Sequence, residues 1–274
     1  MAYIQADDGT QLYYKDWGSG RPVVLIHGWP LSADSWDHAA MELAEAGFRS
    51  IAYDRRGFGR SEQPWGGYDY NTLADDLAAV LRETKAEDAA VVGFSMGGGE
   101  VARYMSRHAG RGVAKAVLIS SVVPYMLKTP DNAEGVDQDI FDQMTEGIRE
   151  ERPKFLAQFF RNFYGVGLLT HPVSDELLEW SRGVAMSASL RATLECANAF
   201  ATTDFRPDLP HFNVPTLIIH GTGDATVPIN ASSRAAAKGI AGSQLIEYEG
   251  APHGLFATHK ERLADDLVSF LSRS

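Results

Sequence analysis

The sequence has almost no cysteine, no excess of basic residues and no long hydrophobic run. Cys196 is the single cysteine among 274 residues, so no disulfide can form within the chain, which is typical of a reducing compartment. With 25 lysines and arginines against 36 aspartates and glutamates, the formal net charge is −11, which disfavours nucleic acid and anionic membranes as partners. The apolar runs are far shorter than the roughly 20 residues of a membrane span. These absences predict a protein that binds neither nucleic acid nor membrane.

The N-terminal segment also lacks the pattern of a secretion signal. It is mixed and acidic, and no basic segment leads into an apolar run. Combined with the lone cysteine, this predicts a cytoplasmic protein. Cys196 itself is predicted to be a small buried hydrophobic residue, because no nucleophile motif surrounds it.

Short apolar runs alternate with amphipathic stretches along the chain. The runs are continuous, which is typical of strands buried on both faces of a parallel sheet. They occupy residues 23–26, 48–53, 89–94, 116–119, 216–219 and 244–248. Helical patterns lie between them, and Asn71 is the expected N-cap of the helix over 73–81. The alternation predicts an α/β fold with a mostly parallel, doubly wound sheet, to which residues 11–17 add an antiparallel edge hairpin.

The middle of the chain breaks this alternation. Residues 124–210 contain no convincing buried strand, and their helical patterns cover 138–151, 154–163, 175–186 and 189–200. A helical insertion of this length inside an α/β sheet indicates a lid over one end of it. We therefore expect a core of residues 1–123 and 211–274, with a helical lid over 124–210 inserted in that core.

The strongest chemical signal is the sequence Gly93-Phe94-Ser95-Met96-Gly97, which matches G-x-S-x-G. It follows a predicted strand and precedes a predicted helix, and small residues on either side of the serine permit the tight turn that exposes its hydroxyl. The helix that begins there directs N–H groups at the site. The pattern predicts that Ser95 is a nucleophile.

A serine nucleophile needs a general base, and the base needs an orienting carboxylate. Asp224 follows a buried strand in a glycine-rich turn, and His253 follows the next strand in Ala-Pro-His-Gly. The chain order Ser, Asp, His is that of an α/β-hydrolase. The backbone N–H groups of Met96 and Trp29 are the expected oxyanion donors, because Met96 follows the nucleophile and Pro30 has no N–H.

Three other features are predicted to be structural. His27 and His220 each directly follow an apolar strand, and the turn over residues 54–61 lacks the third glycine of a dinucleotide loop and the lysine of a P-loop. The histidines show no zinc spacing, and Asp137 and Asp139 lack the glycine and glutamate of a calcium loop. We expect neither a metal nor a cofactor.

The combined motifs resemble the cofactor-free haloperoxidases, a branch of the α/β-hydrolase superfamily also described as aryl esterases and perhydrolases. The likeness rests on HGWP, DRRGFGRS, GFSMGGGEVARY, GTGD, APHG and FRPDLP, and it spans nearly the whole chain. It implies a serine esterase with a triad of Ser95, Asp224 and His253. It also implies that hydrogen peroxide and a short carboxylic acid are converted to a peracid, which oxidises halide in solution without haem, vanadium or another metal. A homo-oligomer is a further expectation.

The predicted substrate pocket is small and apolar, which disfavours long lipid chains. Its expected lining residues are Trp29, Pro30, Val122, Met126, Phe141, Met144, Phe159, Phe163 and Val227. Pro30 is also expected to restrict the Trp29 carbonyl and so to bias the choice between water and hydrogen peroxide.

Several alternatives share parts of this pattern. Lactone or lactam hydrolysis and a physiological peracid role would use the same site. An α/β-hydrolase-type ligand sensor with slow turnover, or a dinucleotide-binding reductase, would not need fast acyl transfer. Haloalkane and epoxide hydrolases carry aspartate at the nucleophile position, so Ser95 argues against them.

Overall fold

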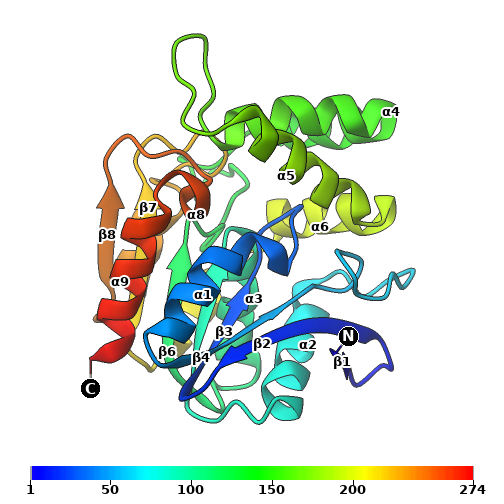
Figure 1. Ribbon diagram of the computed structural model, residues 1–274. Helices are drawn as coiled ribbons and strands as arrows, with labels where there is room; N and C mark the ends of the chain where they lie inside the picture. The colour runs from blue at the N-terminus through cyan, green and yellow to red at the C-terminus, as the bar shows by residue number, and fades with distance from the viewer. Residues whose placement is uncertain (1, 274) are drawn as a thin grey trace.

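Within residues 2–273, the part of the chain that the computed structural model describes, eight strands form one sheet in the order β1-β2-β4-β3-β5-β6-β7-β8 (Figure 1). The strand β2 pairs antiparallel with β1 and β4, and all later pairs are parallel. The sequence therefore predicts both the parallel sheet and its antiparallel edge correctly. The strands are β1 (Ala2–Gln5), β2 (Gln11–Gly18), β3 (Arg21–Ile26), β4 (Phe48–Tyr53), β5 (Ala89–Phe94), β6 (Val113–Ile119), β7 (Thr216–Gly221) and β8 (Gln244–Tyr248).

Helices cover both faces of this sheet, as the continuous apolar runs predict. Val91 of β5 packs in the cluster that contains the buried faces of α2 and α3, whereas Val92 packs with those of α1 and α9. The helices of these layers are α1 (Asp37–Glu45), α2 (Tyr70–Glu83), α3 (Met96–Arg107), α7 (Ser233–Gly239), α8 (Leu255–Thr258) and α9 (Lys260–Ser272). Two 3₁₀ turns, Ala33–Trp36 and Arg206–His211, complete the connections.

One helix begins at a different residue from the one predicted. The N-cap of α2 is Asp69, whose carboxylate accepts from the N–H groups of Asn71 and Thr72 at 3.0 and 3.1 Å. Asn71, the predicted cap, lies inside the first turn. Asp69 is the better cap because its carboxylate satisfies two free donors and its charge is stabilised at the positive end of the helix.

Three helices separate β6 from β7 and lie together at one end of the sheet (Figure 1). They are α4 (Gln138–Phe163), α5 (Asp175–Ser187) and α6 (Leu190–Thr202). The break predicted near residue 152 appears as a kink within α4, where Glu151 has φ −153° and ψ 79° ahead of Pro153. A proline cannot donate to the helix ladder, so the helix kinks there. No helix of the described residues 2–273 combines the length and apolar character required to cross a membrane.

Candidate active site

Ser95 lies in a strained turn between β5 and α3. Its φ of 54° and ψ of −118° are unusual for a residue with a side chain. The flanking glycines are sterically required, because a Cβ at Gly93 would lie 2.4 Å from the carbonyl oxygen of Gly97. A Cβ at Gly97 would lie 2.6 Å from that of Ile26. The G-x-S-x-G spacing thus permits a turn that presents the hydroxyl at the end of the sheet.

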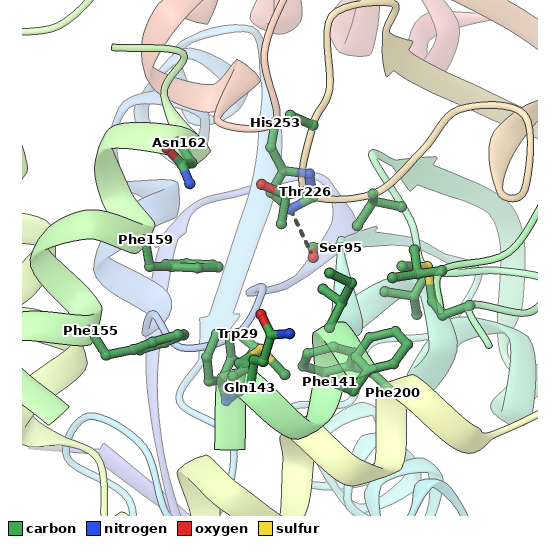
Figure 2. A pocket seen from close by; sticks show the side chains of 17 residues that line it. Trp29, Ser95, Phe141, Gln143, Phe155, Phe159, Asn162, Phe200, Thr226 and His253 are labelled. Carbon is green, nitrogen blue, oxygen red and sulfur yellow. Dashed lines mark hydrogen bonds between the residues drawn. The ribbon is translucent and has the colours of Figure 1, made fainter. Parts of the chain in front are cut away.

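The structure brings Ser95, His253 and Asp224 together, although they are far apart in the chain. The Nε2 atom of His253 lies 2.9 Å from the Ser95 hydroxyl oxygen (Figure 2), and its Nδ1 lies 2.6 Å from Oδ2 of Asp224. Each residue follows the C-terminal end of a parallel strand, β5, β7 or β8. The arrangement is a continuous hydrogen-bonded chain from hydroxyl to imidazole to carboxylate.

The Asp224 carboxylate is buried, and each of its two oxygens has two polar partners. Oδ1 accepts from the N–H groups of Thr226 and Val227, each at 2.8 Å. Oδ2 lies 2.6 Å from His253 and 3.1 Å from Nε2 of His220. Burial by itself raises the pKa of Asp224, but the two histidines outweigh it and hold that pKa well below its usual range. The group therefore remains an acceptor-only anion.

The sequence analysis missed the contact between His220 and Asp224. Besides touching the carboxylate, His220 contacts the Ser233 hydroxyl at 2.6 Å and the Val227 carbonyl at 3.0 Å, and it is fully buried. These contacts tie down the turn after β7, so the predicted structural role is confirmed. The sequence carried no local signal for this contact, because His220 and Asp224 are separated by a non-helical turn, where a spacing of four residues does not bring side chains together.

Phe163 does not line the cavity, contrary to the prediction. It is fully buried, and its ring packs edge-on against His253 with 4.8 Å between centroids. Phe94 contacts the same imidazole at 5.0 Å. The His253 ring therefore packs between Phe163 at the end of α4 and Phe94 at the end of β5.

The backbone N–H groups of Met96 and Trp29 donate no hydrogen bond to any of the residues 2–273. Met96 is the first residue of α3, where N–H groups have no partner within the helix. The indole N–H of Trp29 donates to the Thr193 carbonyl at 2.9 Å, and its ring packs edge-on against Phe159 and Phe200. The two backbone donors are thus available to a ligand.

A cavity of about 360 Å³ opens beside Ser95 and His253. Figure 2 shows it between the nucleophile turn and the helices α4 and α6. Seven predicted residues line it: Trp29, Val122, Met126, Phe141, Met144, Phe159 and Val227. The prediction missed the apolar residues Val136, Ile140, Phe155, Phe200 and Ala225 and the polar residues Gln143, Asn162 and Thr226.

Pro30 is also absent from the cavity lining. It is buried in the loop after β3, and its peptide bond with Trp29 is cis. The Trp29 side chain, which packs against α4 and α6, faces the cavity in its place.

Asp54 and Cys196, which the sequence analysis considered structural, are both buried and do not line the cavity. Asp54 accepts from the N–H groups of Ala33 and Arg60 at 2.8 and 2.7 Å, so the turn over 54–61 is a structural one. Cys196 is fully buried, and burial raises the pKa of its thiol to about 12. Within residues 2–273, no group of three or more His, Cys, Asp or Glu side chains is placed to hold a metal ion.

Comparison with known proteins agrees with this geometry. Residues 21–260 match the model of the α/β hydrolase fold family. The chain is 42% identical to a non-heme chloroperoxidase of Streptomyces lividans and 40% identical to a bifunctional esterase/perhydrolase of Acinetobacter calcoaceticus, with 99% of each chain covered. The crystal structure of a bromoperoxidase from Bacillus anthracis superposes with a TM-score of 0.96 at 43% identity, again over 99% of each chain.

The chain therefore belongs to the α/β-hydrolase family. Its likeness over the full length to non-heme haloperoxidases places it in that branch of the family.

Proposed function

We propose that the protein is a serine hydrolase of small carboxylic esters that also forms peracids from hydrogen peroxide. The observation that carries this proposal is the hydrogen-bonded chain of Ser95, His253 and Asp224, with contacts of 2.9 and 2.6 Å, at the wall of an apolar cavity. A nucleophile, its base and an orienting anion in this order are the requirements of acyl transfer.

The reaction begins when the Ser95 oxygen attacks the ester carbonyl and His253 takes the hydroxyl proton. The carbonyl oxygen becomes an anion, which the free N–H groups of Trp29 and Met96 stabilise. The tetrahedral intermediate collapses, His253 gives its proton to the leaving alcohol, and an acyl-enzyme remains. Water, activated by His253, then releases the acid and restores Ser95.

Hydrogen peroxide replaces water in the second half of the perhydrolase reaction. Its oxygen attacks the acyl carbon, its proton passes to His253 and on to Ser95, and a peracid leaves. The peracid then oxidises halide in solution, returning to the carboxylate as halide becomes hypohalous acid. The relative from Acinetobacter calcoaceticus, an esterase/perhydrolase by name, supports both reactions.

The cavity favours short acyl or aryl groups. Its lining is mainly aromatic and aliphatic, and its 360 Å³ is at the lower end of small-molecule sites. Gln143 and Asn162 of α4 add two side-chain amides to this lining. Residues 124–210, whose helices supply much of the lining, act as a lid over the site.

Continued turnover with p-nitrophenyl acetate separates an enzyme from a ligand sensor. In a stopped-flow experiment, we expect p-nitrophenolate release to exceed one equivalent per active site, because water removes the acyl group from Ser95. Release that stops near one equivalent would contradict the proposed hydrolase and favour a slow sensor.

Halide oxidation should depend on a carboxylic acid in the buffer, because the peracid is the oxidant. With hydrogen peroxide and bromide, we expect a bromide-trapping dye to react rapidly in acetate and only at the enzyme-free rate in phosphate of the same pH. A chelator should change neither rate. Equal enzyme-dependent oxidation in both buffers would refute the peracid route, and the Ser95→Ala variant in acetate serves as the control.

A further inference from the structure

A buried polar chain connects the loop after β3 to the nucleophile helix α3. Arg55 donates through Nε to Oε1 of Glu100 at 2.5 Å and through Nη2 to the His27 carbonyl at 2.6 Å. Tyr53 donates to the other Glu100 oxygen at 2.7 Å. The side chains of His27, Arg55 and Glu100 are almost completely buried, so water does not compete for these contacts.

The protonation of His27 follows from its partners. Its Nε2 lies 3.0 Å from the backbone N–H of Arg55, which can only donate, so Nε2 carries the lone pair. Burial, together with the Arg55 charge, holds the pKa of His27 well below its ordinary value and keeps the ring neutral. The proton is therefore on Nδ1, which donates to the Gly28 carbonyl at 2.9 Å, whereas Nη1 of Arg55 lies farther from Nδ1, at 3.4 Å.

This hydrogen bond determines the direction of the Trp29 N–H. The Gly28 carbonyl accepts from Nδ1 of His27 and also from the N–H of Leu31 at 3.0 Å. The peptide group that joins Gly28 to Trp29 is planar and trans, so its N–H points opposite to its carbonyl. Holding the carbonyl with two donors thus aims the free N–H of Trp29 away from them.

Glu100 links this loop to the second donor. It lies on α3, the helix that begins with Met96, and its ion pair with Arg55 joins that helix to the His27 loop. The two free N–H groups, one on Met96 and one on Trp29, therefore belong to segments that one buried ion pair holds together.

We propose that His27, Arg55 and Glu100 are positioning residues, which fix the Trp29 N–H relative to the Met96 N–H so that both donate to the same oxyanion. This inference rests on the proposed function, because an oxyanion forms only if Ser95 attacks a carbonyl. None of the three side chains touches the substrate cavity.

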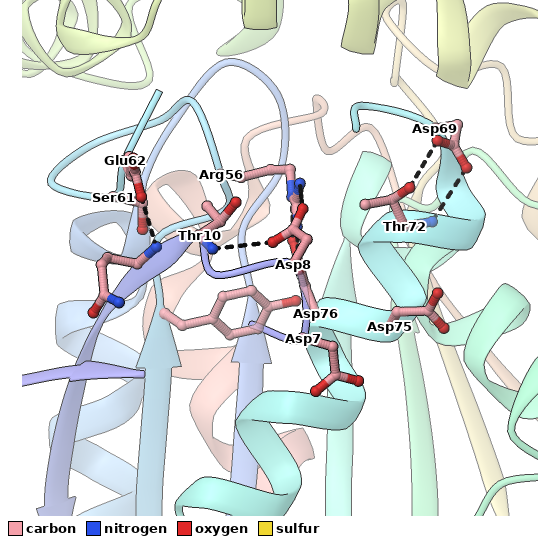
Figure 3. A network of polar contacts seen from close by, with 12 residues as sticks. Asp7, Asp8, Thr10, Arg56, Ser61, Glu62, Asp69, Thr72, Asp75 and Asp76 are labelled. Atoms are coloured by element: carbon pink, nitrogen blue, oxygen red, sulfur yellow. Dashed lines mark hydrogen bonds and ion pairs between the residues drawn. The ribbon is translucent and has the colours of Figure 1, made fainter. Parts of the chain in front are cut away.

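A second buried ion pair in the same turn provides a matched control. Arg56 donates through Nε and Nη2 to both oxygens of Asp76, each at 2.6 Å, and through Nη1 to Asp8 at 2.7 Å (Figure 3). These partners lie on α2 and in the β1–β2 turn, away from the loop after β3. Neither Asp76 nor Asp8 is hydrogen-bonded to His27, Arg55 or Glu100, so this pair tests the loss of a buried ion pair that is not bonded to the His27 loop.

The test compares p-nitrophenyl acetate with its thiono analogue, in which sulfur replaces the carbonyl oxygen. Sulfur is a weak hydrogen-bond acceptor, so the thionoester gains little from oxyanion donors. A variant with a misplaced donor should lose activity on the oxoester and keep activity on the thionoester. Damage to the Ser95–His253 pair, or general loosening of the fold, would lower both rates together.

We expect His27→Ala to reduce kcat on the oxoester by about 10- to 100-fold, because small displacements of a donor have effects of this size. KM and the thionoester rate should stay near their wild-type values. His27→Asn, which retains an amide N–H near the position of Nδ1, should recover part of the loss. Glu100→Gln should lower the ratio of the oxoester rate to the thionoester rate, as His27→Ala does. Asp76→Asn should leave this ratio unchanged.

A thermal unfolding scan gives the unfolding midpoint of each variant. The rates are measured at a temperature well below that midpoint, where the variant is folded. Parallel losses on both substrates in His27→Asn and Glu100→Gln, or an unchanged ratio in all variants of the network, would overturn the inference. A shift of equal size in Asp76→Asn would overturn it as well. Wild-type protein without Ser95-dependent turnover would instead overturn the proposed function and, with it, this inference.

Discussion

Replacing Ser95 with alanine is expected to reduce kcat for p-nitrophenyl acetate by about 10⁴- to 10⁶-fold. The hydroxyl is the only group that can carry the acyl intermediate in this proposal, and its oxygen lies 2.9 Å from the base. His253→Ala should have nearly the same effect, because nucleophile and base act as a unit. The double variant should be little worse than either single one, and the remaining activity should come from the oxyanion donors.

The measurement is steady-state kinetics on purified protein with its thermal unfolding recorded in parallel. Ser50→Ala is the matched control: Ser50 is a buried serine of β4 whose hydroxyl has no hydrogen-bond partner among the described residues. It should retain near wild-type kcat. If Ser95→Ala kept a tenth of the wild-type kcat, Ser95 would not be the nucleophile.

Replacing Asp224 with asparagine is expected to lower kcat by about 10⁴-fold, because it reverses the hydrogen-bonding pattern around a buried anion. The carboxylate accepts two backbone N–H groups on Oδ1 and contacts two histidines on Oδ2. An amide has only one acceptor oxygen, so its NH₂ group must face one of these pairs. If it faces His253, Nδ1 becomes an acceptor and Nε2 carries the proton, so the imidazole can no longer accept the proton of Ser95.

The pH dependence of kcat and the fraction of folded protein are measured with the same substrate. Asp208→Asn is the control, since Asp208 is also a buried carboxylate but pairs with Arg103 at 3.2 Å, away from the cavity. It is expected to affect unfolding more than turnover. Wild-type kcat in Asp224→Asn would show that the carboxylate does not orient His253.

The nucleophile turn could be predicted from sequence because its requirements are local. Gly93 and Gly97 each lie two residues from Ser95, so the motif can be recognised locally. A Cβ at Gly93 would collide with the Gly97 carbonyl in the same turn, and one at Gly97 would collide with the Ile26 carbonyl on the neighbouring strand β3. The buried strands were predictable for a similar reason, since each apolar run is continuous and a strand alternates its residues between two covered faces. The choice between neighbouring candidates for one role was harder to predict. Asn71 was the expected N-cap of α2, but Asp69, two residues earlier, caps the helix.

The residues that line the cavity could not all be predicted from sequence, because the lining is formed by segments that are distant in the chain. Phe155, Phe159 and Phe163 all lie on α4, but the first two line the cavity while the third packs behind His253. Gln143 and Asn162 are polar residues on a helix, and nothing in their local sequence distinguishes a cavity residue from a solvated one. Which side of α4 faces the site is decided by how the helix packs over the end of the sheet.

By itself, the sequence determined the α/β fold, the strained serine turn and the order of Ser95, Asp224 and His253, because these depend on periodicity, steric limits and chain order. Tertiary structure alone decided that His220 shares the Asp224 carboxylate and that His27, Arg55 and Glu100 connect the Trp29 loop to α3. The His220 contact closes the turn after β7, and the contacts of Arg55 join the segment after β4 to the His27 loop and to α3. These side chains are buried, and a buried charge or N–H group without a hydrogen-bond partner costs free energy. Which partner each group has therefore depends on which groups the fold brings together.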